Sequence, residues 1–216
     1  FHASMIAAPS GFAHQGANCI VLCDEEGYHR VGARYLTAAT GMTMREIKDN
    51  PAKARELYAP VKERIKIKDA TGRDMNWVES ICKTYKPDIV LLDMGDKFAK
   101  TGGFSRTDEA LKANAIHARM IAKEYDCAMF YMSQLSADAE GKVLLNQSMM
   151  EGSRTGKAAE ADLMLLIAKN PVKINEHGEE TKEDSERHLN VVKNKLTGWH
   201  GVVHCNLEYQ TARYSV

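Results

Sequence analysis

Short apolar runs alternate with segments of helical periodicity, and this alternation constrains the fold more than any other feature of the sequence. Runs such as IVLC and IVLL are short, continuous and bounded by polar residues, which favours strands buried on both faces. Residues 28–41, 74–85 and 107–125 carry apolar side chains at helical spacing, and they fall between such runs. This order predicts an α/β fold with a mainly parallel sheet flanked by helices.

The boundaries of these elements follow from local signals. Gly41 is expected to end the helix over 28–41, and Asp74 to cap the helix over 74–85. Two strands around the turn LTGWHG predict a C-terminal antiparallel hairpin, at residues 188–195 and 202–209. About five core strands precede the hairpin, and they are predicted at residues 18–24, 64–70, 88–94, 127–134 and 161–169.

Composition limits the class of function. The 216 residues suit one compact domain, and the formal net charge is zero, so a nucleic-acid site would have to be a local cluster of cations. No apolar run approaches the length of a membrane-spanning helix. The five cysteines are scattered without a CxxC pair, which indicates reduced, buried thiols of an intracellular protein. His200, His204 and Cys205 lack a second ligand pair, and we interpret them as ordinary strand residues rather than zinc ligands.

Two predicted strands end in carboxylates. Asp93 ends the strand over 88–94, and in an open α/β sheet ligands bind beyond the carboxyl ends of the strands. A carboxylate there can hold a Mg²⁺-bound water beside a nucleotide phosphate. Asp24, Glu25 and Glu26 follow the strand over 18–24, where one acid could orient metal and another could polarise an attacking water. The alternatives are a turn cap for Asp93 and a solvated helix start for the other acids.

Two further polar patterns follow later strands. Ser133 and Gln134 end the strand over 127–134, where an amide can touch a terminal phosphate and respond to its loss. Lys193 and Lys195 lie on one face of a strand, because side chains alternate, and two ammonium groups before a turn could meet phosphate. The alternatives are a turn-forming polar residue and an exposed strand face.

The order of these signals resembles the ATPase domain of DnaB-type replicative ring helicases, a branch of the RecA-like fold, in its phage version above all. The resemblance spans nearly the whole chain from residue 18 onward. The most specific matches are the last two of the stretches IVLCDEE, KPDIVLLDMGDKF, FYMSQLS, GSRTGKAAEADLMLLI and VVKNKLTGWHGVVHCNLEYQTARYS.

The resemblance implies ATP and Mg²⁺ as cofactors and assigns catalytic roles to four residues. Asp93 resembles the Walker B acid that holds Mg²⁺ through water. Glu25 resembles the glutamate that activates the hydrolytic water, with Glu26 as the second choice. Gln134 resembles the phosphate sensor.

Lys193 and Lys195 resemble the pair that reaches the ATP of the neighbouring subunit. Where Lys195 stands, the family usually has an arginine finger, and lysine supplies charge without the bidentate fork. Three loops, 95–106, 135–150 and 151–157, resemble those lining the central DNA channel. Their cations are the expected contacts to the DNA backbone: Lys97, Lys100, Arg106, Lys142, Arg154 and Lys157.

The phosphate loop G-x-x-x-x-G-K-[ST] is absent from the sequence. The resemblance implies a single RecA-like domain over 1–216, cut just after that loop, in a protein of the bacterial or phage-infected host cytoplasm. Its expected partners are single-stranded DNA, further copies in a hexameric ring, and a primase or helicase loader. Two alternatives stay open: a filament-forming recombination or repair ATPase of the RecA/RadA kind, and a non-catalytic scaffold.

Overall fold

The computed structural model describes residues 2–100, 106–152, 154–171 and 185–216. None of the helices in these ranges is long and apolar enough to cross a membrane. The first half of the chain contains four strands, β1 (Cys19–Cys23), β2 (Ile65–Asp69), β3 (Ile89–Asp93) and β4 (Ala128–Tyr131). Its helices are α1 (His2–His14), α2 (Tyr28–Thr40), α3 (Met44–Asp49), α4 (Pro51–Tyr58), α5 (Met75–Tyr85) and α6 (Thr107–Glu124).

The second half of the chain contains a short helix and four antiparallel strands. These are α7 (Arg154–Glu160), β5 (Leu163–Lys169), β6 (Glu186–Asn194), β7 (Gly201–Glu208) and β8 (Arg213–Ser215). Three single 3₁₀ turns lie in the loops: η1 (Gly95–Lys97), η2 (Ala137–Ala139) and η3 (Gln147–Met149).

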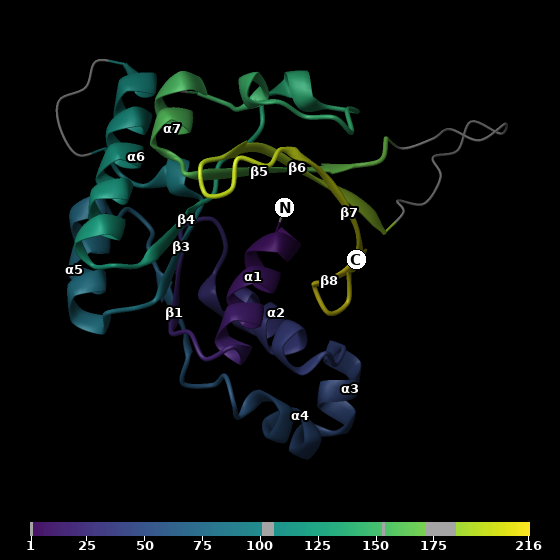
Figure 1. Cartoon of the computed structure of the whole chain (residues 1–216). Helices are drawn as coiled ribbons and strands as arrows, with labels where there is room; N and C mark the ends of the chain where they lie inside the picture. Colours follow the sequence, from purple (N-terminus) through teal and green to yellow (C-terminus); the bar gives the residue numbers. More distant parts are fainter. Residues whose placement is uncertain (1, 101–105, 153, 172–184) are drawn as a thin grey trace, which may run out of the picture.

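The first sheet is parallel, with the strand order β2-β1-β3-β4, and it has helices on both faces (Figure 1). Alternate side chains of β1 and β3 point to opposite faces. Val21 and Leu91 pack with α1 and α2, whereas Leu22 and Leu92 pack with α5 and α6. The sheet therefore separates two apolar cores, and the predicted α/β layering is confirmed.

The second sheet is antiparallel, in the order β5-β6-β7-β8. The predicted hairpin is present as β6 and β7. The segment 161–169, expected among the core strands of the first sheet, forms β5 but pairs with β6 in antiparallel fashion. Its burial alternates, because Met164, Leu166 and Ala168 cover an apolar cluster with η2 and η3. The antiparallel end is thus a full sheet built around the hairpin.

The helix boundaries follow the local signals. Asp74 caps α5, where its Oδ1 accepts a hydrogen bond from the Trp77 amide at 3.0 Å. Gly41 ends α2 in the left-handed conformation with φ 69°, and a Cβ there would lie 2.5 Å from the Arg213 guanidinium. Arg213 of β8 needs that space, because its side chain donates to the carbonyls of Ala38 and Ala39 at the end of α2. This contact ties the second sheet to the first half of the chain.

Candidate functional site

The carboxyl ends of β1, β3 and β4 meet at one edge of the parallel sheet. Cys23 is in register with Asp93, and the Asp24 amide donates to the Asp93 carbonyl at 2.7 Å. The Gly95 amide donates to the Met132 carbonyl at 2.9 Å, which joins the loop after β3 to the end of β4. The chain leaves β1 toward α2 on one face and reaches α6 on the other face after β3, so this edge is a topological switch point, where α/β proteins bind ligands.

Asp93 lies at the centre of this edge and is 1% exposed. Its charge and, to a greater extent, burial raise the pKa of the Cys23 thiol to about 12. The chain then passes close to the Tyr131 ring, and a Cβ at Gly95 would lie 2.6 Å from that ring. Glycine is required there because no other residue leaves room for this approach. The turn after Asp93 is therefore fixed by packing.

The acids after β1 have different partners. Glu25 forms an ion pair with Lys97 of η1 at 3.0 Å. Glu26 is held by both guanidinium nitrogens of Arg34 on α2. Burial is the main cause that raises the pKa of Asp24, and the nearby Lys97 opposes it. Glu25 is thus the acid joined to the loop that follows Asp93, whereas Glu26 is tied to the helix.

A buried charge cluster, here called the Asp96 cluster, joins three segments at the same edge. It comprises Asp96 of η1, Ser133 after β4 and Lys157 of α7. Lys157 Nζ lies 2.9 and 3.1 Å from the two Asp96 carboxylate oxygens and 2.6 Å from Ser133 Oγ. The Ser133 hydroxyl also donates to Asp96 at 2.5 Å. The Lys157 side chain is only 3% exposed, so the prediction that it contacts DNA does not agree with its position.

Gln134 is exposed and lies just beyond the Asp96 cluster. Its backbone carbonyl accepts a hydrogen bond from the Glu151 amide at 3.1 Å. The residue therefore links the end of β4 to the start of the segment that leads into α7.

Lys193 and Lys195 lie at the carboxyl end of α7, and they reach the same side, as the alternation predicts. Both ammonium groups contact the Ala159 carbonyl at 3.4 Å, and Lys193 also donates to the Ala158 carbonyl. Lys195 is 3.4 Å from Asp162, which also binds Arg119 at 3.0 Å. Burial is the main cause that lowers the pKa of Lys193, followed by the neighbouring Lys195. Cations at the end of a helix are favourable, because free carbonyls and the helix dipole attract them.

The remaining cations predicted to contact DNA are exposed. Lys97 is paired with Glu25, and Lys100 is 3.4 Å from the Thr107 hydroxyl. Arg106 forms a two-point pair with Asp108 at 2.9 and 3.0 Å. Lys142 is exposed in the loop after η2. The side chain of Arg154, and residues 101–105 of the first loop, lie outside the described residues.

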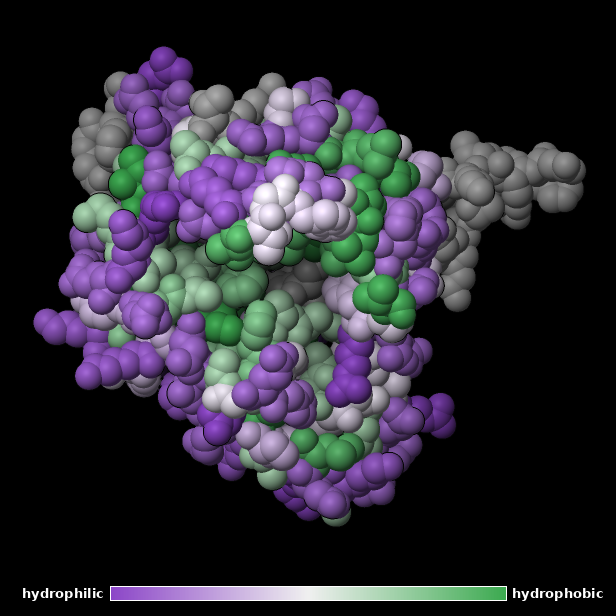
Figure 2. All heavy atoms as spheres, in the orientation of Figure 1, coloured by the Kyte–Doolittle hydropathy of each residue, from purple (hydrophilic) through white to green (hydrophobic). Residues whose placement is uncertain are grey.

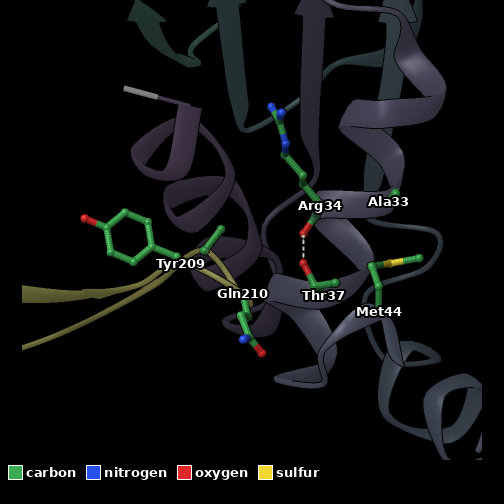
Figure 3. A pocket seen from close by; sticks show the side chains of 7 residues that line it. Ala33, Arg34, Thr37, Met44, Tyr209 and Gln210 are labelled. Atoms are coloured by element: carbon green, nitrogen blue, oxygen red, sulfur yellow. Dashed lines mark hydrogen bonds between the residues drawn. The ribbon is translucent and has the colours of Figure 1, made fainter. Parts of the chain in front are cut away.

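A surface pocket lies away from the acids, between α2 and the turn from β7 to β8 (Figure 3). It has a volume of about 250 Å³ and is lined by Ala33, Arg34, Thr37, Met44, Tyr209, Gln210 and Ala212. The Arg34 side chain extends away from Gln210 and Met44. Figure 2 shows a hollow nearby, with apolar residues between the antiparallel sheet and the helices α1 and α2. The pocket lining offers no carboxylate, which separates it from the strand-end acids.

The parallel sheet with helices on both faces, its switch point and the acids at that edge define the RecA-like fold of helicase ATPase domains. Over 99% of its residues the chain superposes on 79% of a solved helicase ATPase domain, with a TM-score of 0.83 and 16% sequence identity. It also superposes, over 98% of its residues, on a DnaB-like replicative helicase solved in a study of that helicase's interactions with primase (TM-score 0.81, identity 16%). The chain covers 55% of that helicase. No protein-family model and no curated protein sequence matches the chain.

Proposed function

We propose that this chain is the ATPase domain of a replicative DNA helicase, which hydrolyses ATP between the subunits of a ring and moves along single-stranded DNA. The observation that carries the proposal is the switch-point edge, where Asp93 ends β3 and Glu25 follows β1. The same fold in two solved helicase structures supports it. The chain spans about half the length of one of them, so the activity of the whole protein belongs to the proposal.

Asp93 suits the role of a Mg²⁺ holder. Mg²⁺ prefers oxygen ligands and keeps several of its waters, and Asp93 offers a carboxylate at the ligand-binding edge of the sheet. Because Asp93 is 1% exposed, we expect contact through a bridging water rather than direct coordination. The ion would neutralise charge on the ATP phosphates. Cradling the phosphates needs a phosphate loop, which this sequence lacks, and its presence upstream stays a prediction.

Glu25 is proposed as the base that orients the attacking water, and Lys97 as its restraint. The two side chains form an ion pair of 3.0 Å, and Lys97 is also a proposed DNA contact. A DNA phosphate that takes Lys97 would release the Glu25 carboxylate toward the water, which links DNA binding to hydrolysis. Lys97→Met should therefore raise ATP turnover measured without DNA. Lys100→Met is the matched control, because Lys100 bonds to a hydroxyl rather than to an acid of the described residues, and it should change only DNA affinity.

Gln134, Lys193 and Lys195 are proposed to act on the phosphates. Gln134 would report loss of the terminal phosphate to the segment leading into α7. The two lysines would reach the ATP of the adjacent subunit, which requires them to leave the end of α7, where they now contact the Ala159 carbonyl. Lys195→Ala should reduce turnover in the ring without changing nucleotide binding by an isolated subunit. An equal loss in both settings would exclude action across the interface.

DNA contacts are proposed for Lys97, Lys100, Arg106 and Lys142, which are exposed. Contacts to phosphates are independent of sequence and weaken as salt concentration rises. Charge-removing variants should thus reduce the slope of affinity against salt by about one counterion each. A primase or helicase loader is proposed as a further partner of the assembled protein.

The decisive experiment uses the longer protein that includes a phosphate loop upstream of this chain. Glu25→Gln should abolish ATP hydrolysis and leave ATP binding intact, whereas Glu26→Gln, the control, should retain hydrolysis because Glu26 is held by Arg34. Unchanged turnover in Glu25→Gln would refute its assignment. Electron microscopy with an ATP analogue and DNA should show closed rings; filaments would indicate a recombinase. A protein without ATP binding would indicate a scaffold.

A further inference from the structure

We propose that the antiparallel sheet binds a divalent transition-metal ion, Zn²⁺ by preference, through Glu186, His188 and His204. Glu186 and His188 are two residues apart on β6, so their side chains lie on the same face. His204 of β7 lies directly opposite His188 in the register of the two strands. One ligand atom from each residue lies within 4.8 Å of the other two.

The spacing of the ligand atoms fits tetrahedral coordination. The Nδ1 atoms of His188 and His204 are 3.0 Å apart, and His204 Nδ1 is 3.5 Å from a Glu186 carboxylate oxygen. Bonds of about 2.0–2.1 Å to a tetrahedral zinc ion place neighbouring ligand atoms about 3.3–3.4 Å apart. Both distances lie within a few tenths of an ångström of that value, so small side-chain rotations suffice to accommodate the ion.

Asn170, which follows β5, orients two of the three ligands. Its side-chain oxygen lies 2.9 Å from His188 Nε2, so the ring donates its Nε2 proton to Asn170. In the neutral ring this leaves a lone pair on Nδ1, the atom that faces His204. The Asn170 amide also donates to the second Glu186 oxygen at 2.9 Å. Partners of this kind fix the tautomer and direction of metal ligands in known sites.

The ligand set and its exposure indicate the kind of ion. Two imidazole nitrogens and one carboxylate suit Zn²⁺, whereas Mg²⁺ and Ca²⁺ prefer oxygen ligands throughout. His188 is buried at 4% exposure, but the His204 side chain is 65% exposed. The ion can thus enter from solvent and keep a water molecule as its fourth ligand.

The proposed metal site is separate from the proposed nucleotide edge. Six residues of β6 divide His188 from Asn194, which at about 3.3 Å per residue is roughly 20 Å, and the two lysines lie at the far end. An ion at Glu186, His188 and His204 would cross-link β6 to β7. From sequence spacing alone His204 is an ordinary strand residue, because its partner ligands lie on another strand.

The test is titration of Zn²⁺ into the chelator-treated chain, followed by calorimetry. We expect one ion per chain, and a thermal midpoint raised by about 5–10 °C when free zinc is 100-fold above its dissociation constant. His204→Ala and Glu186→Gln should each weaken binding at least about tenfold. His200→Ala is the control, because His200 is an exposed histidine outside the cluster and should bind as the unmodified chain does.

Two results would overturn the proposal. The first is equal zinc affinity in the unmodified chain, His204→Ala and Glu186→Gln, or no binding at all. The second is a thiolate-to-metal absorption band with Co²⁺, which would place the ion on cysteines instead. His204 is exposed, so His204→Ala should fold normally, and its circular dichroism spectrum without metal should match that of the unmodified chain.

Discussion

The Asp96 cluster allows a quantitative test of how the candidate site is held together. Replacing Asp96 with asparagine keeps its shape but removes the charge that pairs with Lys157, whose side chain is 3% exposed. Removing one partner of a buried ion pair costs about 3–5 kcal/mol, because the other charge stays buried. The Asp96 side chain is 18% exposed and partly solvated, so we expect the lower end, about 3 kcal/mol.

This loss should lower the thermal midpoint by about 6–12 °C for a domain of this size. Circular dichroism melting of Asp96→Asn, Lys157→Met and the double variant measures it. Because the double variant leaves no unpaired charge, it should be more stable than the sum of the single losses predicts, by at least about 1 kcal/mol. Asp108→Asn, which removes an exposed pair with Arg106, should barely shift the midpoint. Additive losses in the double variant would show that the pair contributes no coupling.

Three further predictions concern the fold around the site. Gly95→Ala should cost about 1–3 kcal/mol in urea denaturation, because its Cβ would meet the Tyr131 ring at 2.6 Å; an unchanged midpoint would show that the ring moves freely. Asp74→Ala should cost about 1 kcal/mol by the same measurement, since the α5 cap is lost, whereas Asp74→Asn should retain most of the stability. The raised pKa of Cys23, about 12 against 9.0, lowers its thiolate fraction about a thousandfold near neutral pH, so iodoacetamide should label it only after unfolding; rapid labelling of the folded chain would contradict this.

The sequence was most informative where the structure depends on neighbours along the chain. Apolar runs predicted β1 and β3 within a residue or two, and Asp74 and Gly41 were recognised as helix ends because capping depends on nearby residues. The meeting of three strand ends at one edge also followed, because parallel strands bring their carboxyl ends together.

Contacts between distant residues were not predictable in this way. The pairing of β5 with β6 depends on a partner strand, not on the apolar run itself. Lys157 carries the same local signature as an exposed loop cation, but Asp96, 61 residues away, holds it in a buried pair. The relation between His188 and His204 likewise depends on strand register, which a single sequence does not reveal.

The separation of the two apolar cores by the parallel sheet has a consequence for engineering this chain. Val31 lies in the core on the α2 side and Val78 in the core on the α5 side, and the two clusters share no residue. A packing defect on one side cannot be relieved by side chains on the other, since the sheet backbone lies between them. Each face can therefore be redesigned independently, and stability changes from the two faces should simply add.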